Sequence, residues 1–107
     1  MKLPPTTTIP IRKLTHYLLV PREHDDKSKF LALADFTLQN PNALLIAIRR
    51  LIATQDAIED CANDYGVFFH VDGDLMSPTN KLLSVRTIWI RRKIDGLFHF
   101  VTLIPLR

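Results

Sequence analysis

One cationic residue of this sequence lies in a segment that is otherwise mostly apolar. Arg86 belongs to the stretch KLLSVRTIWIRR, and strand alternation puts its side chain on the same face as Ile88. A guanidinium in apolar surroundings is normally paired with a carboxylate or aligned with an anion, because burying it alone is costly. Two interpretations follow for Arg86. It forms an ion pair with Asp72 or Asp74, or it acts as a phosphate clamp.

Histidine is the side chain best suited to acid/base chemistry near neutral pH. The sequence contains four histidines without metal-ligand spacing, and it has no Gly-rich phosphate loop or GxSxG motif, so no metal or cofactor is expected. On the last predicted strand, His99 and Thr102 are three residues apart, which predicts that they point to opposite faces. Thr102 is then expected on the face of Phe98 and Phe100.

Hydrophobic periodicity predicts the helices that must position these groups. A short helix is expected from about Pro10 to Val20, and a second one ends near Asp35. The clearest helix starts at Asn40-Pro41 and runs to Ala53. Its apolar stripe consists of Leu44, Leu45, Ile48, Leu51 and Ile52.

Three segments rich in β-branched and aromatic residues predict strands. They cover 67–72, 81–92 and 97–104, and an additional edge strand near 57–62 is favoured over a helix tail. Residues 73–80 are expected to form a loop, and Asp95-Gly96 a hairpin turn. The order predicts an α+β fold in which N-terminal helices pack on a three- to four-stranded antiparallel meander. Leu45, Ile48, Leu51, Ile52, Val85 and Trp89 are expected to share its core.

Length and composition place the chain among small globular proteins. Its 107 residues predict one domain, residues 1–107, and the net charge of +3 permits contact with nucleic acid without requiring it. The single cysteine excludes an intrachain disulfide. No apolar run reaches the length of a membrane span or of a signal peptide core, so a cytoplasmic protein without membrane contact is expected.

Short motifs along almost the whole chain carry a family resemblance. They are Leu3-Pro4, Arg12-Lys13-Leu14-Thr15-His16-Tyr17-Leu18-Leu19, Glu23-His24, Lys27-Ser28-Lys29-Phe30, Tyr65-Gly66, Val85-Arg86-Thr87-Ile88-Trp89-Ile90 and Val101-Thr102. This pattern resembles a family of small uncharacterised bacterial domains that occur alone or in toxin cassettes. That family is similar to the ribonuclease-toxin superfamily of barnase, EndoU, colicin D and RelE. The superfamily places N-terminal helices before a four-stranded antiparallel sheet.

The resemblance implies a catalytic set and a substrate. His24 corresponds to the acid or base, Lys29 and Arg86 to phosphate clamps, and Thr102 to a positioning hydroxyl. These groups suffice for cleavage of RNA without a metal ion. The implied partners are RNA and a small cognate antitoxin or immunity protein. In this chain the Gly-Phe that commonly closes the second helix of the family is Asp35-Phe36.

Three further residues are candidates for substrate binding, namely Trp89, Arg91 and His99. An exposed Trp89 could stack a base, but core packing is favoured because a strand tryptophan among Val and Ile normally fills the interior. The alternative to a nuclease is a non-enzymatic interaction module or immunity protein whose basic strand face docks an acidic partner. An open cleft that unites Arg86, Lys29 and His24 favours the nuclease, and salt-bridged arginines beside an apolar patch favour the module.

Overall fold

The structure is a computed structural model that describes residues 1–21 and 27–106. Its elements are α1 (Ile11–Lys13), the π-helix η1 (Leu14–Leu18), α2 (Ser28–Ala32), α3 (Pro41–Thr54), β1 (Ile58–Asn63), β2 (Gly66–Met76), β3 (Leu82–Arg92) and β4 (Phe98–Pro105). The predicted catalytic residue His24 lies outside the described residues.

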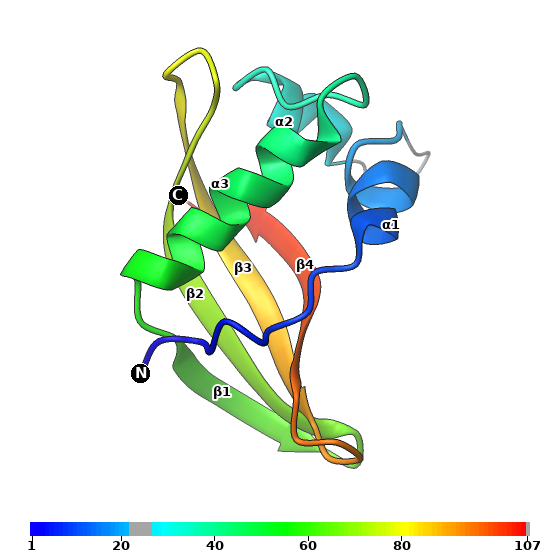
Figure 1. Cartoon of the computed structure of the whole chain (residues 1–107), viewed down its shortest axis with the longest axis vertical. Coiled ribbons are helices and arrows are strands. Elements are labelled where there is room, and N and C mark those ends of the chain that lie inside the picture. The colour runs from blue at the N-terminus through cyan, green and yellow to red at the C-terminus, as the bar shows by residue number, and fades with distance from the viewer. Residues whose placement is uncertain (22–26, 107) are drawn as a thin grey trace.

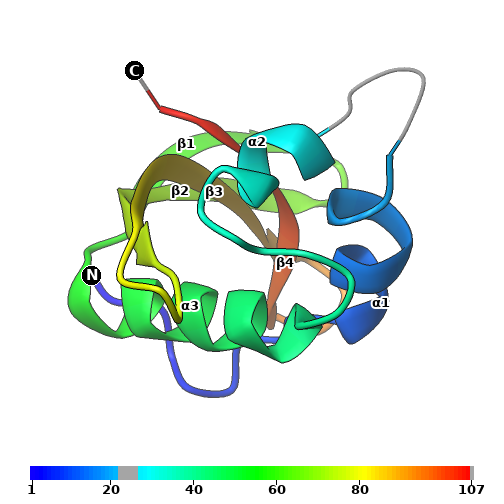
Figure 2. The same cartoon turned by 90° about the horizontal axis from the view of Figure 1, so that it is seen from above.

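The strands form one antiparallel sheet in the order β1-β2-β3-β4, so each strand pairs with its neighbour in sequence. The long helix α3 lies across one face of the sheet, and α1 stands beside β4 (Figure 1; Figure 2). The N-terminal segment crosses the same side as α3, below it in Figure 1. This arrangement confirms the predicted α+β meander with helices on a sheet.

The core lies between α3 and the face of the sheet that α3 covers. The largest fully buried side chains are Trp89, Phe36, Phe100, Leu14, Leu18, Leu31, Leu44, Ile48, Leu75, Leu103, Val71 and Val85. Alternation in β3 is as predicted, because Val85, Thr87 and Trp89 are buried and their neighbours are partly exposed. In α3 the predicted stripe is buried, except for Leu45, which is half-buried against the core. The opposite face of the sheet, called the open face below, is not covered by α3.

The strand β2 is longer than predicted, since it continues through Gly73 to Met76. A Cβ on Gly73 would lie 2.5 Å from Cδ1 of Leu51. The glycine therefore lets α3 approach the sheet closely within a continuous strand, and its prediction as part of a loop is wrong.

The first predicted helix is divided into a single α-turn and the π-helix η1. The N–H of Leu19 donates to the carbonyl of Leu14 over 2.9 Å, an i→i+5 bond that accommodates one extra residue in the turn. At the end of the α2 region, Asp35 has φ 64°. This is the left-handed conformation that glycine adopts most readily.

A β-bulge in β4 changes the predicted faces of its residues. Trp89 pairs with Phe100 whereas Ile88 pairs with Thr102, which leaves Val101 as an extra residue. The bulge moves Thr102 to the open face together with His99, the partner of Ile90. The prediction that His99 and Thr102 point to opposite faces, with Thr102 beside Phe100, is therefore wrong.

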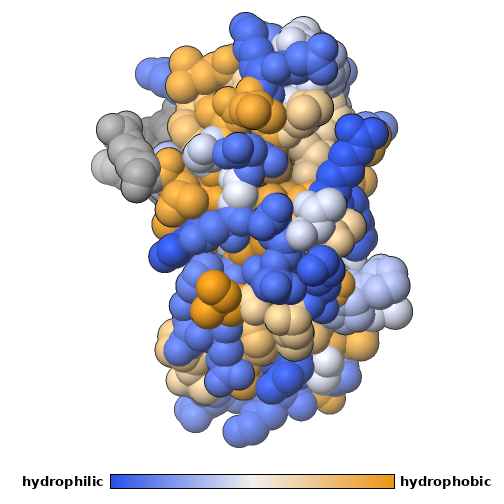
Figure 3. Space-filling view, turned by 90° about the vertical axis from the view of Figure 1, so that its left-hand side faces the viewer, coloured by the Kyte–Doolittle hydropathy of each residue, from blue (hydrophilic) through white to orange (hydrophobic). Residues whose placement is uncertain are grey.

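Hydrophobic side chains are exposed where β2 connects to β3. Met76 and Leu82 are cross-strand partners and are 50% and 59% exposed. The space-filling view shows hydrophobic surface toward this end of the molecule, above a hydrophilic band (Figure 3). Within residues 1–21 and 27–106, no helix is long and apolar enough to cross a bilayer.

Candidate functional site

The π-helix and the β-bulge face each other across a hollow of about 560 Å³, here called the basic pocket. Its lining residues come from α1, η1 and β4, and they are Arg12, Lys13, His16, Tyr17, Val101 and Thr102. Both π-helices and β-bulges are enriched at functional sites, because the extra residue redirects the side chains around it. Two such departures at one hollow mark it as the first candidate site.

Two cations and a histidine project from one side of the helical segment into this pocket. Lys13 Nζ donates to the carbonyl oxygen of Val101, the bulge residue, over 3.2 Å. Arg12 and His16 are exposed and lie four residues apart, a spacing that puts them on the same helical face. The pocket therefore offers positive charge and an imidazole side chain.

Hydroxyl groups complete the lining. His16 Nδ1 is 2.9 Å from Oγ1 of Thr15, so one nitrogen of the imidazole ring has a hydrogen-bond partner. Thr102, on the open face, supplies a hydroxyl from the opposite wall. It was predicted as a site residue, and the structure places it in the basic pocket.

A buried lysine lies behind the tyrosine of this pocket. Lys27 is only 7% exposed, and its Nζ donates to the Tyr17 hydroxyl over 3.3 Å and lies 5.4 Å from the ring centroid. Lysine is rarely buried without a role, because desolvation of its ammonium is costly. Lys27 adds positive charge to the wall that carries Tyr17.

Arg86 forms a bidentate ion pair rather than lining an open cleft with the other predicted residues. Its Nε and Nη2 donate to Oδ1 and Oδ2 of Asp72 over 2.8 and 2.9 Å. Hydrogen bonding from the guanidinium lowers the pKa of Asp72, and hydrogen bonding to the carboxylate raises the pKa of Arg86. Of the two interpretations of Arg86, the structure shows the ion pair with Asp72.

A second carboxylate pairs with a histidine on the same open face. His70 is 9% exposed, and its Nδ1 lies 2.7 and 2.8 Å from the two carboxylate oxygens of Asp60. Because His70 pairs with Ile88, and Ile88 with Thr102, the three lie in one row across the sheet. His70 is at one end of this row, and Thr102, at the other end, lines the basic pocket.

The structure does not bring Lys29 to this site. Lys29 is exposed on α2 and lines a separate hollow with α2 and the segments that flank it, among them Leu19, Phe36 and Thr37. No lining residue is shared with the basic pocket. Of the described catalytic candidates, Thr102 lies in the basic pocket, Arg86 on the adjoining face, and Lys29 elsewhere.

The three substrate-binding candidates have contacts within the protein. Trp89 is fully buried, so its ring is not available to stack a base, and the favoured core position is confirmed. The Arg91 guanidinium lies 5.6 Å from the ring centroid of Phe69, on the face covered by α3. His99 Nε2 is buried without a hydrogen bond, 3.6 Å from Oδ2 of Asp95. None of the three lines the basic pocket.

Sequence reasoning missed most of the cations that line this pocket. Arg12, Lys13 and His16 belong to the first predicted helix and to one of the motifs, and Lys27 begins another motif, but none of the four was predicted as a site residue. A signal was present, because residues 12, 13 and 16 occupy the face opposite the buried positions Leu14 and Leu18. What they face could not be read from the sequence, since Val101 and Thr102 lie near the other end of the chain.

Comparison with known proteins gives the family and supports the fold. The structure is similar, with a TM-score of 0.65 and 19% sequence identity, to a chain of a contact-dependent growth inhibition toxin–immunity protein complex from Klebsiella pneumoniae 342. The match covers 92% of each chain, and at this identity it shows a shared fold. No curated protein matches the sequence. The family model described as domain of unknown function DUF6883 matches residues 2–107, and the chain belongs to this family.

Proposed function

We propose that this domain binds the phosphodiester backbone of RNA in the basic pocket and cleaves it without a metal ion. The observation that carries the proposal is the convergence of Arg12, Lys13, His16 and Thr102 on one hollow, formed where η1 meets the bulge of β4. Cations that hold a phosphate, beside a group that exchanges protons, are the minimum that this reaction requires.

The reaction can be written with the groups of the pocket. A base takes the proton of the RNA 2′-hydroxyl, and the 2′-oxygen attacks the adjacent phosphorus. The bond from phosphorus to the 5′-oxygen breaks, and an acid protonates that oxygen, which leaves a 2′,3′-cyclic phosphate and a 5′-hydroxyl. His16 is the proton-exchanging group of the lining, and Arg12 and Lys13 face the charge that develops on the phosphorane.

The resemblance to ribonuclease toxins and the structural likeness both support a toxin-related role. The similar Klebsiella structure is named as a toxin–immunity protein complex. We therefore propose RNA as substrate and a small cognate immunity protein as partner, in the cytoplasm. Arg86 is assigned a supporting role on the open face, since Nε and Nη2 of its guanidinium already donate to Asp72.

Purified protein tests the proposal on a fluorescent single-stranded RNA in the presence of EDTA. We expect Lys13→Met and His16→Gln each to lower the cleavage rate by at least about 100-fold, the lower range for loss of acid/base catalysis. Lys29→Met tests the rival site, because it removes the phosphate clamp implied by the resemblance from a separate hollow, and it should leave the rate close to that of the wild type. Thermal midpoints close to that of the wild type show that the variants fold.

Two outcomes would reject this assignment. If Lys29→Met abolishes cleavage and Lys13→Met does not, the site implied by the resemblance is correct and the basic pocket is not the active site. If no RNA is cleaved between pH 5 and 8 and expression is harmless, the enzyme proposal fails.

The second candidate function is a non-enzymatic interaction module. It is supported by the ion pair of Arg86 with Asp72, which leaves the open face largely neutralised, and by the edge strand β1. All six residues of β1 are exposed, so its free edge can pair with a strand of another protein. This candidate predicts no cleavage, and it predicts that a proline placed in β1 abolishes partner binding.

A further inference from the structure

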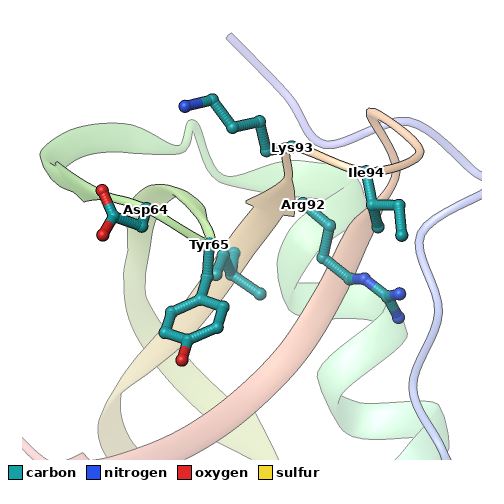
Figure 4. Close-up of a pocket in the computed structure, with 6 residues that line it drawn as sticks. Asp64, Tyr65, Arg92, Lys93 and Ile94 are labelled. Atoms are coloured by element: carbon teal, nitrogen blue, oxygen red, sulfur yellow. The ribbon is translucent and has the colours of Figure 1, made fainter.

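Two turns from different hairpins lie next to each other at one end of the sheet and enclose a second hollow of about 600 Å³, here called the tyrosine hollow (Figure 4). Its lining residues are Asp64, Tyr65, Ile90, Arg92, Lys93 and Ile94. This volume is within the range of sites that bind small molecules or parts of larger ones. No residue of the basic pocket contributes to it.

Backbone hydrogen bonds hold the walls of the tyrosine hollow in place. The N–H of Lys93 donates to the carbonyl of Tyr65 over 2.9 Å, which joins the two turns. The side chain of Asn63 accepts from the N–H of Tyr65 over 2.8 Å, and the side chain of Asp95 accepts from the N–H of Leu97 over 2.9 Å. The hollow is therefore formed before a ligand binds, which lowers the cost of binding.

The walls expose large side chains that the fold does not use for packing. Tyr65 is 77% exposed and Ile94 is 83% exposed, although turns usually carry small polar residues. Ile90, on the open face, forms part of the lining between them. An aromatic ring beside aliphatic side chains is suited to a flat, apolar ligand.

The charge of the hollow indicates an anionic ligand. The lining contains two cationic side chains, Arg92 and Lys93, and one carboxylate, Asp64. In Figure 4 the Arg92 guanidinium lies on the same side of the strand end as the Tyr65 ring, whereas Lys93 extends in another direction. Arg92 Nε forms an ion pair with Oδ2 of Asp95 at 3.8 Å, a distance too long for a hydrogen bond, so the guanidinium keeps N–H donors for a further anion.

The open face connects this hollow with the basic pocket. Thr102 in the basic pocket pairs with Ile88, and Ile90 of the tyrosine hollow is the next residue of β3 on the same face. Two residues of a strand span about 7 Å. A nucleic acid strand bound at the basic pocket therefore reaches the tyrosine hollow within a few nucleotides.

We propose that the tyrosine hollow is a subsite for an unpaired base of single-stranded RNA, which stacks on Tyr65 while an adjacent phosphate contacts Arg92. Exposed aromatic side chains recognise unpaired RNA bases by stacking on them. The inference rests on the proposed function for the identity of the ligand. It adds a preference for single strands, since a base within a duplex cannot enter the hollow.

The test measures binding by fluorescence anisotropy, using the whole chain and a short single-stranded RNA with 2′-O-methyl groups, which cannot be cleaved. We expect Tyr65→Ala to raise the Kd by roughly 5- to 150-fold, the range for loss of one stacked base. Tyr65→Phe should stay within about twofold of the wild type, because its ring still stacks. The matched control is Leu82→Ala, which removes another exposed apolar side chain at the opposite end of β3.

An RNA that lacks bases but keeps its backbone tests whether Tyr65 acts on the bases rather than on the backbone. On this ligand, wild type and Tyr65→Ala should bind equally, and a duplex of the same sequence should bind more weakly than the single strand. Equal affinities of wild type and Tyr65→Ala for the intact single strand would overturn the inference and leave the hollow to a protein partner. Binding is measured on an RNA that cannot be cleaved. The binding assay can therefore support the subsite even if the cleavage assay fails, and it can reject the subsite even if cleavage is observed.

Discussion

A hydroxyl in the core makes a quantitative prediction about the strand that carries Trp89. Thr87 is fully buried, and its Oγ1 donates to the carbonyl of Val71 over 2.8 Å and accepts from Nε1 of Trp89 over 2.8 Å. Thr87→Val keeps the shape of the side chain but removes both hydrogen bonds. Because Trp89 is fully buried, its N–H cannot bond to water instead.

The expected loss is the cost of the indole N–H left without a partner, about 1–3 kcal/mol. The new methyl group offsets part of it, by at most about 0.8 kcal/mol. A net loss of roughly 0.2–3 kcal/mol remains, with a mid-range value of about 1.6 kcal/mol. For a chain of 107 residues, an unfolding entropy of about 2.1 cal/mol/K per residue converts the mid-range loss to a fall in Tm of about 7 °C.

Urea unfolding followed by circular dichroism measures the effect in four proteins, which are the wild type, Thr87→Val, Trp89→Phe and the double variant. In the Trp89→Phe background no indole donor is left to lose its partner, so Thr87→Val should cost little there. An equal cost in both backgrounds would refute the argument, since the hydrogen bond from Trp89 would then not be its source. The m-values should remain equal, which shows that the unfolding transition is comparable.

Two further predictions concern the ion pair and the helix contact. The bond from Arg86 lowers the pKa of Asp72 in the folded state, so its stabilisation is present above the unfolded pKa of about 3.9 and is lost as the pH falls through the lower folded pKa. The urea midpoints of wild type and Arg86→Ala should therefore differ at pH 6 and converge near pH 2, and a constant difference would contradict the ion pair. Gly73→Ala should lower stability by about 1–3 kcal/mol through overpacking against Leu51, and Leu51→Ala in the same chain should remove that sensitivity, as measured by thermal unfolding.

The sheet and the long helix could be predicted because their periodicity matches one buried face. In β3 the residues Val85, Thr87 and Trp89 alternate with partly exposed ones, as a strand with one covered face requires. Asn40-Pro41 predicted where α3 starts, and the apolar stripe of α3 predicted which of its sides is buried. In both elements, local preference and burial against the other element agree.

The length of β2 could not be predicted, because a glycine is compatible with two different local structures. Gly73 permits a turn, and it also permits another backbone or side chain to approach closely. The sequence favours the turn, and the packing of Leu51 shows the close approach. The information needed to decide lies in α3, which precedes β2 in the chain but contacts it only after folding.

The candidate site escaped prediction for a related reason, which concerns the extra residues in η1 and β4. Alternation and helical periodicity assign a side chain to a face by counting residues, and one inserted residue reverses or rotates every later assignment. Val101 is such a residue in β4, and it moves Thr102 onto the open face. The i→i+5 bond of Leu19 to Leu14 marks another in η1, the element that carries His16.

Both irregularities occur where the first helical segment meets the last strand, and the bond from Lys13 to Val101 joins residues 88 positions apart. Each irregularity departs from the regular hydrogen bonding of its own element. Together they turn His16 and Thr102 toward one hollow. Departures from local regularity that converge on a single place are expected at a functional site, where a chain accepts a local cost for a required geometry. The failure of periodicity at these two points therefore supports the basic pocket as the proposed site.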